Sequence, residues 1–394
     1  MLRMPDERKV CVVTGSRSDY GLLRELMDVL SCLPGADMQL LVTGSHLSGS
    51  HGMTIDVIRA DGYTVDWSVD LLLASDTPLA TVKSMGLGLI GFADAFSALK
   101  PDLVVVLGDR YEILMAASAC LVLRIPIAHI HGGELTSGAI DEAIRHSVTK
   151  MASYHFTSTE QYRQRVVQLG EQPERVFNTG LLAVDAIERM TLLTRPELEE
   201  ELAFEFAEHN VLVTFHPVTL DQDAGISHFR ELLAALAEFE DIHVIFTEAN
   251  ADSLGIELNR LIAEHVHLHP DACVSFKYMG QLRYLSTLKL VDVVIGNSSS
   301  GVIEAPVLGT PSVNIGERQG GRLRAPSVVD CPPEKAAIVA AVNAIISHGA
   351  RHRCDTCDHP FGNTGAARRI ADKLLELPLE GVLVKPFHDL EIIP

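Results

Sequence analysis

Small polar residues followed by a single carboxylate occupy one segment in the second half of the chain. Residues 296–304 read Gly-Asn-Ser-Ser-Ser-Gly-Val-Ile-Glu and come directly after the apolar run Val291 to Ile295. This order predicts a strand, a loop and a helix start, whose free backbone N–H groups and helix dipole attract an anion. Glu304, expected one turn into that helix, is suited to accept hydrogen bonds from vicinal ribose hydroxyls. The segment therefore predicts a nucleoside diphosphate site, and the alternative is an ordinary serine-capped turn. The candidate ligands are Asn297, Ser298, Ser299, Ser300, Gly301 and Glu304.

Charged and imidazole side chains follow other apolar runs, at the positions where strands are expected to end. The clusters are Gly15 to Gly21, Gly108 to Glu112, His131 to Glu134 and His216 to Thr219. Open α/β sheets bind ligands outside the carboxyl ends of their strands, so these clusters mark a candidate site. Taken singly, Asp109 and Asp141 could equally cap helices, and His216 could belong to a turn. Their shared placement beside a phosphate loop favours acid/base chemistry instead.

The elements expected to position these residues alternate between strands and helices. The predicted strands are Val10 to Thr14, Gln39 to Thr43, Leu103 to Leu107, Ile127 to Ile130, Tyr154 to Thr157, Val211 to Phe215, His243 to Phe246, Val274 to Phe276, Val291 to Ile295 and Ser312 to Ile315. Amphipathic stretches separate those of the first half: Tyr20 to Leu30, Ala80 to Leu99, Glu112 to Leu123 and Asp141 to Ala152. Such alternation is typical of parallel βαβ units. A charged stretch from Pro196 to Glu201 separates the two series. We therefore predict an α/β fold of two Rossmann-like, doubly wound domains.

The composition fits two well-buried domains. The chain has 394 residues, more than one core usually supports, with 47% hydrophobic, 21% charged and 5% aromatic residues. A formal net charge of −20 argues against nucleic acid and anionic membranes as partners, while leaving room for a local basic pocket. No apolar leader is evident from Met1 to Lys9, and no uncharged run approaches the roughly 20 residues that span a bilayer. We expect a cytoplasmic protein that does not insert into membranes.

The seven cysteines are scattered and odd in number, which favours reduced thiols over a disulfide framework. Cys354 and Cys357 lie between His352 and His359, and this set could hold zinc. Four ligands within eight residues would be unusually tight, so the segment is predicted to be a surface loop. No metal or other cofactor is expected.

Six ordered motifs resemble those of hydrolysing UDP-N-acetylglucosamine 2-epimerases, over nearly the whole chain. They are Gly15 to Gly21, Leu107 to Glu112, His129 to Glu134, Ile140 to His146, Gly296 to Glu304 and Asn314 to Gln319. The resemblance implies the GT-B fold, with two Rossmann-like domains facing a central cleft. It implies a sugar-binding catalytic domain at residues 1–185 and a UDP-binding domain at 186–363. A C-terminal helix and tail at 364–394 are then expected to pack back on the first domain.

The reaction that this resemblance implies begins with loss of UDP from C1 and of the proton from C2, giving 2-acetamidoglucal. Water then adds with inversion at C2, so the products are N-acetylmannosamine and UDP, for sialic acid biosynthesis. The carried-over acid/base residues are Asp109 and Asp141, with His131 where many members have glutamate and Glu134 as the alternative to His131. The further substrate contacts implied are Arg17, Arg110, Glu112, Arg145, His216 and Arg318. Helical spacing also predicts that Arg145 orients Asp141 by an ion pair.

Other functions share these motifs. The same chemistry on UDP-2,4-diacetamido-2,4,6-trideoxyglucose would feed legionaminic acid, whereas a non-hydrolysing epimerase would release UDP-N-acetylmannosamine and no free UDP. A GT-B glycosyltransferase would release UDP only with an acceptor present, and a nucleotide-sugar sensor would have no use for acid/base groups. The partner expected is a UDP-sugar. A homodimer or homotetramer is also expected, since closed homo-oligomers are the commonest assemblies.

Overall fold

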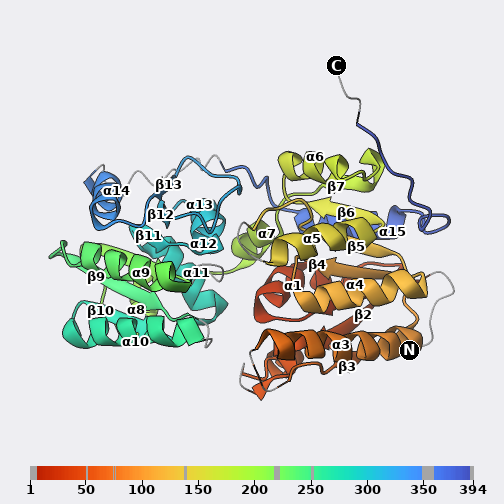
Figure 1. The fold of residues 1–394 in the computed structure, drawn as a ribbon, viewed down its shortest axis with the longest axis horizontal. Coiled ribbons are helices and arrows are strands. Elements are labelled where there is room, and N and C mark those ends of the chain that lie inside the picture. The colour runs from red at the N-terminus through yellow and green to blue at the C-terminus, as the bar shows by residue number, and fades with distance from the viewer. Residues whose placement is uncertain are drawn as a thin grey trace. The chain divides into compact units, whose positions relative to one another are not determined.

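The computed structural model describes residues 7–49, 52–73, 75, 77–136, 140–216, 222–249, 253–347 and 359–390. They form two compact units, each built on a parallel sheet with helices on both faces (Figure 1). The first unit comprises Met1–Glu134, Ile140–Ala186 and Phe361–Pro394. The second comprises Leu135–Ala139 and Ile187–Pro360, so the chain leaves the first unit and returns to it near its C-terminal end.

The sheet of the first unit has seven parallel strands in the order β3-β2-β1-β4-β5-β6-β7. The strands are β1 (Arg8–Thr14), β2 (Ala36–Thr43), β3 (Trp67–Val69), β4 (Leu103–Leu107), β5 (Ile127–Ile130), β6 (Tyr154–Thr157) and β7 (Val176–Asn178). The strand order reverses between the neighbours β1 and β4, and sheets of this kind bind ligands at such a point. Gly15 follows β1 there, and Gly108 follows β4.

Capping residues in the sequence mark the ends of several helices that pack on this sheet. The helices are α1 (Arg17–Cys32), α2 (Ile55–Ala60), α3 (Pro78–Leu99), α4 (Tyr111–Leu123), α5 (Ile140–Met151), α6 (Glu160–Gln168), α7 (Leu182–Arg189) and α15 (Ala366–Glu376). Ser16 and Asp19 form a capping box at the start of α1. Thr77 caps α3, whose first residue is Pro78, and Lys100 ends it in the left-handed conformation.

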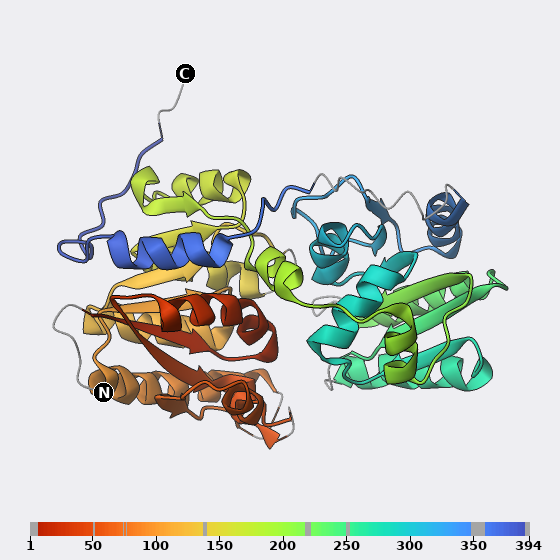
Figure 2. The ribbon, with the colours of Figure 1, turned by 180° about the vertical axis from the view of Figure 1, so that it is seen from behind.

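Alternate residues of each strand face opposite sides of the sheet and build two cores. Val10 and Val12 of β1 belong to the core that includes α1 and α15. Cys11 and Val13 belong to the core that includes α3, α4 and α5. Figure 2 shows α15, in blue, beside α1 on one face of the sheet. The C-terminal helix is therefore a structural layer of the first unit.

The second unit repeats this pattern with six parallel strands in the order β10-β9-β8-β11-β12-β13. The strands are β8 (His209–Thr214), β9 (Ile242–Thr247), β10 (Cys273–Phe276), β11 (Val293–Gly296), β12 (Ser312–Ile315) and β13 (Val328–Cys331). The helices are α8 (Arg195–Leu202), α9 (Gln222–Leu236), α10 (Ser253–Leu268), α11 (Gly280–Leu290), α12 (Ser299–Val302), α13 (Glu304–Val307) and α14 (Lys335–Ser347). The order of strands reverses between β8 and β11, which places His216 and Asn297 just beyond two neighbouring strand ends.

Three strands and one helix differ from the sequence-based prediction. The pattern does not predict β3, β7 or β13, which have three or four residues each and lie at the edges of their sheets. The single helix expected after Gly296 is two four-residue helices, α12 and α13, separated at Ile303. Glu304 therefore begins α13 instead of lying one turn into a continuous helix.

Among the residues that the structure describes, one helix, α3, is long and apolar enough to cross a membrane by length and composition alone, although Lys83 and Asp94 interrupt it. The core helix of a soluble protein passes the same test. Phe92 and Phe96 of α3 are buried in the core beneath the sheet, and α3 packs along α4. One side of this helix is thus a layer of the first unit.

Candidate active site

Asp109 lies just beyond the end of β4, where Arg145 holds its carboxylate. Gly108 has a φ of +80° and turns the chain there in a conformation that glycine adopts without strain. The Arg145 guanidinium donates a hydrogen bond to Asp109 Oδ2. Arg145 is only 3% exposed, so this charge-assisted bond is shielded from water. The result is an ion-paired carboxylate at the point where the strand order reverses.

Arg145 also holds the turn that follows β5. Its Nη1 donates to the His131 carbonyl at 2.8 Å and lies 3.8 Å from Glu134 Oε2. His131 has a φ of +65°, which is uncommon for a residue other than glycine. A second hydrogen bond, from His131 N to the Phe156 carbonyl at 2.9 Å, fixes this conformation. Backbone strain of this kind is concentrated at functional sites.

His131 and Glu134 lie side by side within this turn. The distance from His131 Nδ1 to Glu134 Oε1 is 3.7 Å, and the same oxygen accepts a hydrogen bond from Ser158 Oγ at 3.1 Å. Both residues are 6% exposed. The Glu134 carboxylate is therefore held in place by Ser158 and Arg145, next to an imidazole that it can orient.

Asp141 and Arg145 both lie on α5, but the prediction of an ion pair between them is wrong. In the described part of the chain, the ion pairs of Arg145 run to Asp109 and Glu134. Arg145 points inward, where two largely buried carboxylates need a counter-charge more than the half-buried Asp141 does. Asp141 lies in the first turn of α5, where a negative charge complements the helix dipole.

Arg110 is oriented by a carboxylate buried beneath it. Arg110 Nε and Nη2 donate to Glu112 Oε1 at 3.0 and 2.9 Å. The Glu112 side chain has no exposed surface, and burial raises its pKa, although the Arg110 charge opposes that shift. The fit requires glycine nearby, since a Cβ on Gly44 would lie 2.7 Å from Glu112 Oε1. Glu112 is thus placed to direct the partly exposed guanidinium of Arg110.

The loop after β1 is closed by a carboxylate from the first turn of α1. This carboxylate, of Asp19, accepts hydrogen bonds from the backbone nitrogens of Gly15 at 2.8 Å and Ser16 at 2.7 Å. These two N–H groups are therefore already engaged. Arg17 lies in the first turn of α1 and is exposed.

In the second unit, Asn297 and His216 join the ends of β11 and β8. His216 N donates to Asn297 Oδ1 at 2.7 Å, and Asn297 Nδ2 donates to the His216 carbonyl at 2.8 Å. Arg318 Nη1 and Gln319 Nε2 both donate to the Asn297 carbonyl, at 3.0 and 2.8 Å. Burial, and then the Arg318 charge, lowers the pKa of His216 to about 4. Near pH 7, His216 is therefore a neutral hydrogen-bonding group and adds no positive charge.

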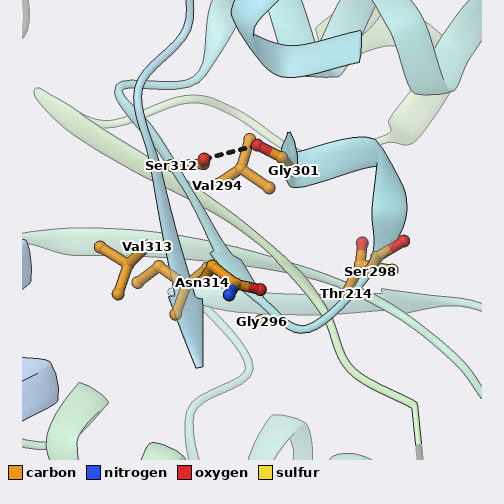
Figure 3. Close-up of a pocket in the computed structure, with 9 residues that line it drawn as sticks. Thr214, Val294, Gly296, Ser298, Gly301, Ser312, Val313 and Asn314 are labelled. Atoms are coloured by element: carbon orange, nitrogen blue, oxygen red, sulfur yellow. Dashed lines mark hydrogen bonds between the residues drawn. The ribbon is translucent and has the colours of Figure 1, made fainter. Parts of the chain in front are cut away.

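The serine loop has the local bonds of a capped helix start. Ser298 Oγ accepts from Ser300 N at 3.4 Å, and the Tyr284 hydroxyl is hydrogen-bonded to Ser300 Oγ. Burial raises the pKa of Tyr284 to about 12, so its hydroxyl keeps its proton. Ser312 Oγ donates to the Gly301 carbonyl at 2.5 Å, which ties α12 to β12 (Figure 3). A pocket beside the loop is lined by Thr214, Val294, Ile295, Gly296, Ser298, Gly301, Ser312, Val313 and Asn314.

Several residues of these clusters receive no role in the sequence prediction, although His129 and Gln319 stand within its motifs. They are His129, Thr149, Ser158, Tyr284 and Gln319. A histidine inside the otherwise apolar run Ile127 to Ile130 is the one signal that could have found His129. The others have side chains that commonly occur on surfaces or in cores without a functional role.

Within the residues that the structure describes, no group of three or more His, Cys, Asp or Glu residues could hold a metal ion. Cys354 and Cys357, the pair considered for zinc, lie outside the residues that the structure describes.

Comparisons with known proteins agree on one family. The sequence profile of the UDP-N-acetylglucosamine 2-epimerase family matches residues 30–375. The GDP/UDP-N,N'-diacetylbacillosamine 2-epimerase (hydrolyzing) of Campylobacter jejuni is 41% identical over 324 residues, which cover 82% of this chain and 84% of that protein. The UDP-N,N'-diacetylbacillosamine 2-epimerase (hydrolyzing) of Legionella pneumophila is 33% identical over 378 residues, 96% of this chain and 98% of that protein.

The fold agrees as well. The crystal structure of UDP-GlcNAc 2-epimerase from Neisseria meningitidis bound to UDP-GlcNAc has a TM-score of 0.82 with this structure. The two share 18% sequence identity, and the match covers 94% of this chain and 100% of that chain. The prediction of two parallel-sheet α/β domains of the GT-B type is thereby confirmed. With a family profile matched over most of its length, the chain belongs to the UDP-N-acetylglucosamine 2-epimerase family.

Proposed function

We propose that this chain is a hydrolysing 2-epimerase of a UDP-2-acetamido sugar, releasing UDP and the free sugar epimerised at C2. The observation that carries the proposal is the cluster in which Arg145 holds both Asp109 and the turn of His131 and Glu134. Removing a proton from C2 and later returning one require positioned bases and acids. A protein that only binds a nucleotide sugar has no use for such groups.

The reaction would take place in two steps. First, a base takes the C2 proton, the C–H electron pair forms the C1=C2 double bond, and UDP leaves C1 with the electrons of the C1–O bond. Second, the oxygen of water bonds to C1 of the glycal, and a proton is delivered to C2 on the opposite face. Asp109, Asp141 and His131 are the proposed groups for these proton transfers. The carboxylates would also stabilise the positive charge that develops at C1.

The nucleotide would be held by cations and by backbone donors. Arg17, Arg110 and Arg318 are proposed to contact the diphosphate, with Arg110 directed by Glu112. His216 would contribute a neutral hydrogen bond. The remaining proposed contacts are Asn297, Ser298, Ser299, Ser300 and Gly301 for the diphosphate and Glu304 for the ribose hydroxyls.

Between the two acid/base alternatives of the β5 turn, the contacts support His131. Glu134 Oε1 accepts from Ser158 and lies beside His131 Nδ1, and Glu134 Oε2 lies 3.8 Å from Arg145. A carboxylate bound on this many sides is suited to orient an imidazole and poorly suited to swing toward a substrate. We assign proton transfer to His131 and its orientation to Glu134.

The preferred sugar is proposed to be the 2,4-diacetamido-2,4,6-trideoxy sugar, N,N'-diacetylbacillosamine. This reverses the order of the two candidates from the sequence, and the names of the two hydrolysing relatives support it. The product would then feed legionaminic acid instead of sialic acid. UDP release measured without an acceptor should show kcat/KM at least about tenfold higher for the diacetamido sugar, as expected for one recognised polar substituent. The opposite ratio would return UDP-N-acetylglucosamine as the substrate.

We further propose a cytoplasmic homo-oligomer, at least a dimer, formed through an apolar stripe on α3. Leu79, Val82, Leu89 and Ile90 recur at helical spacing and are each at least 42% exposed. These four side chains carry no charge, so a second copy could pack against them without burying a charged group.

A further inference from the structure

His129 is a fully buried imidazole between the two loops of the candidate site. It lies in β5 and has 0% exposed surface. Its Nε2 is 2.8 Å from the Gly108 carbonyl, and its Nδ1 is 3.1 Å from Thr149 Oγ1. Gly108 immediately precedes Asp109, and Thr149 lies on α5, the helix that carries Arg145. The ring thus links the Asp109 loop to the helix that supplies its counter-charge.

The two partners of His129 define its protonation state. A carbonyl oxygen can only accept, so Nε2 carries the hydrogen. Burial lowers the pKa of His129 to about 3, so the ring is neutral near pH 7 and Nδ1 accepts from the Thr149 hydroxyl. In this state the imidazole is a rigid spacer with one donor and one acceptor, both in use.

The same pair lies close to the turn that carries His131. A Cβ on Gly132 would lie 3.2 Å from both His129 Nδ1 and Thr149 Oγ1. A side chain at position 132 would therefore crowd this pair, and glycine leaves the space free. His129 is thus hydrogen-bonded to the loop of Asp109 and, together with Thr149, lies where a Cβ in the turn of His131 and Glu134 would reach.

We propose that His129 is a positioning residue for the epimerase reaction, fixing the Gly108 peptide and so the direction of the Asp109 carboxylate, without touching substrate. The inference rests on the proposed function. A displacement of about 1 Å in an acid/base group can cost about 100-fold in rate, so the position of this peptide matters to kcat. Substrate binding, which depends on other residues, should change little.

Three variants separate this role from ordinary core packing. His129→Gln keeps an N–H donor near the position of Nε2, His129→Leu removes it at similar size, and Thr149→Val removes the donor to Nδ1. We expect kcat to fall about 100-fold in His129→Leu, within about tenfold in His129→Gln and about tenfold in Thr149→Val, each with KM within about threefold. Circular dichroism and thermal unfolding establish the folded fraction by which each kcat is corrected. Equal losses in the Gln and Leu variants, or losses in KM alone, would overturn the proposal. If the Leu variant does not fold, Thr149→Val still decides it.

A second measurement needs no turnover. In ¹⁵N-histidine NMR at pH 7, the His129 signal is identified as the one that the wild type shows and His129→Gln lacks. We expect this signal to be that of a neutral ring with its hydrogen on Nε2. In ¹⁵N-arginine NMR, the guanidinium signal of Arg145, assigned with Arg145→Lys, should be unchanged in His129→Gln and altered in Thr149→Val. A hydrogen on Nδ1 would contradict the inference. A wild type that turns over neither sugar would refute the proposed function, while these spectra would still report on His129.

Discussion

At the scale of single residues, an imidazole is suited both to take and to return a proton, and we propose this role for His131. Glu134 stands 3.7 Å from His131 Nδ1, and Ser158 and Arg145 keep it there. An imidazole backed by a fixed carboxylate is a common way to set the orientation of an acid/base group.

This assignment predicts unequal effects of two substitutions. His131→Ala should lower kcat by about 1,000-fold, because general acid/base groups contribute about 100- to 10,000-fold. Glu134→Gln should cost about tenfold, since the amide keeps the shape of the carboxylate and its contact with Ser158. Ser158→Ala is the matched control and should resemble Glu134→Gln. Steady-state kinetics with the preferred sugar would contradict the assignment if Glu134→Gln lost more activity than His131→Ala.

Sequence reasoning singled out Asp109, His131, Glu134 and Arg145, since each stands in a motif after a strand or at a helix start. It misjudged how they connect. Helical spacing makes Asp141 the local neighbour of Arg145, but burial decides the actual pairing, and Arg145 turns to Asp109 instead. Burial depends on the packing of the whole folded unit, so a local sequence pattern does not predict it. His129 was missed for the same reason, because its two partners come from distant segments.

At the scale of elements, a buried carboxylate binds the segment after α15 to the rest of the first unit. Lys385 Nζ pairs with Glu171 Oε2 at 2.6 Å, and Glu171 also pairs with Lys150 at 2.5 Å and with His155 Nε2 at 2.9 Å. The Glu171 side chain has no exposed surface. Tyr154 adds a hydrogen bond from its hydroxyl to the Pro378 carbonyl at 2.5 Å. The C-terminal segment is therefore held by charge as well as by packing.

The pairs of Glu171 predict a pH dependence of stability. Although burial opposes ionisation, the bonds from His155, Lys150 and Lys385 lower the pKa of Glu171 from 4.5 to about 2. A carboxyl whose folded-state pKa is depressed stabilises the fold above its unfolded pKa, and loses that contribution as pH falls toward 2. The shift corresponds to about 3 kcal/mol.

Urea unfolding at pH 7, 5, 4 and 3 would test this dependence. The difference in unfolding free energy between the wild type and Glu171→Gln should be constant from pH 7 to about 5 and shrink below that. Glu376→Gln, whose partner Lys373 lies on the surface, is the control and should show no measurable difference at any of these pH values. A wild-type advantage that stays constant down to pH 3 would contradict the depressed pKa.

Element prediction was best where apolar runs are long and buried, as in β1 and β4. The edge strands β3, β7 and β13 are too short to form such a run, and pairing with a neighbour defines them. The break at Ile303 has a different origin. Pro306 in α13 has no N–H to bond the Val302 carbonyl and its ring crowds that carbonyl, so one continuous helix is disfavoured, and the prediction of a single helix overlooked this signal.

At the scale of the whole molecule, the apolar stripe on α3 predicts association. Ile90, which is 65% exposed, lies at the C-terminal end of this stripe. Ile90→Glu should convert a dimer into monomers, because a stable interface does not tolerate a buried, unpaired charge. Ile256→Glu on α10 of the second unit, where Ile256 is 62% exposed, is the matched control and should leave the assembly unchanged.

Light scattering would measure both variants, with circular dichroism to establish that they fold. A monomeric wild type, or a dimer that survives Ile90→Glu, would contradict the proposed interface. Wild-type binding to lipid vesicles that Ile90→Glu abolishes would assign the stripe to a membrane surface instead.

Family membership and the Arg145 cluster together support one central claim, that the enzyme eliminates UDP and then adds water to the glycal. Proton NMR in D₂O, with UDP-N,N'-diacetylbacillosamine or UDP-N-acetylglucosamine and no acceptor, tests it most directly. We predict free UDP together with a free 2-epimeric sugar that carries deuterium at C2. A UDP-linked epimer without free UDP would contradict the hydrolytic step, and free sugar retaining hydrogen at C2 would contradict elimination through the glycal.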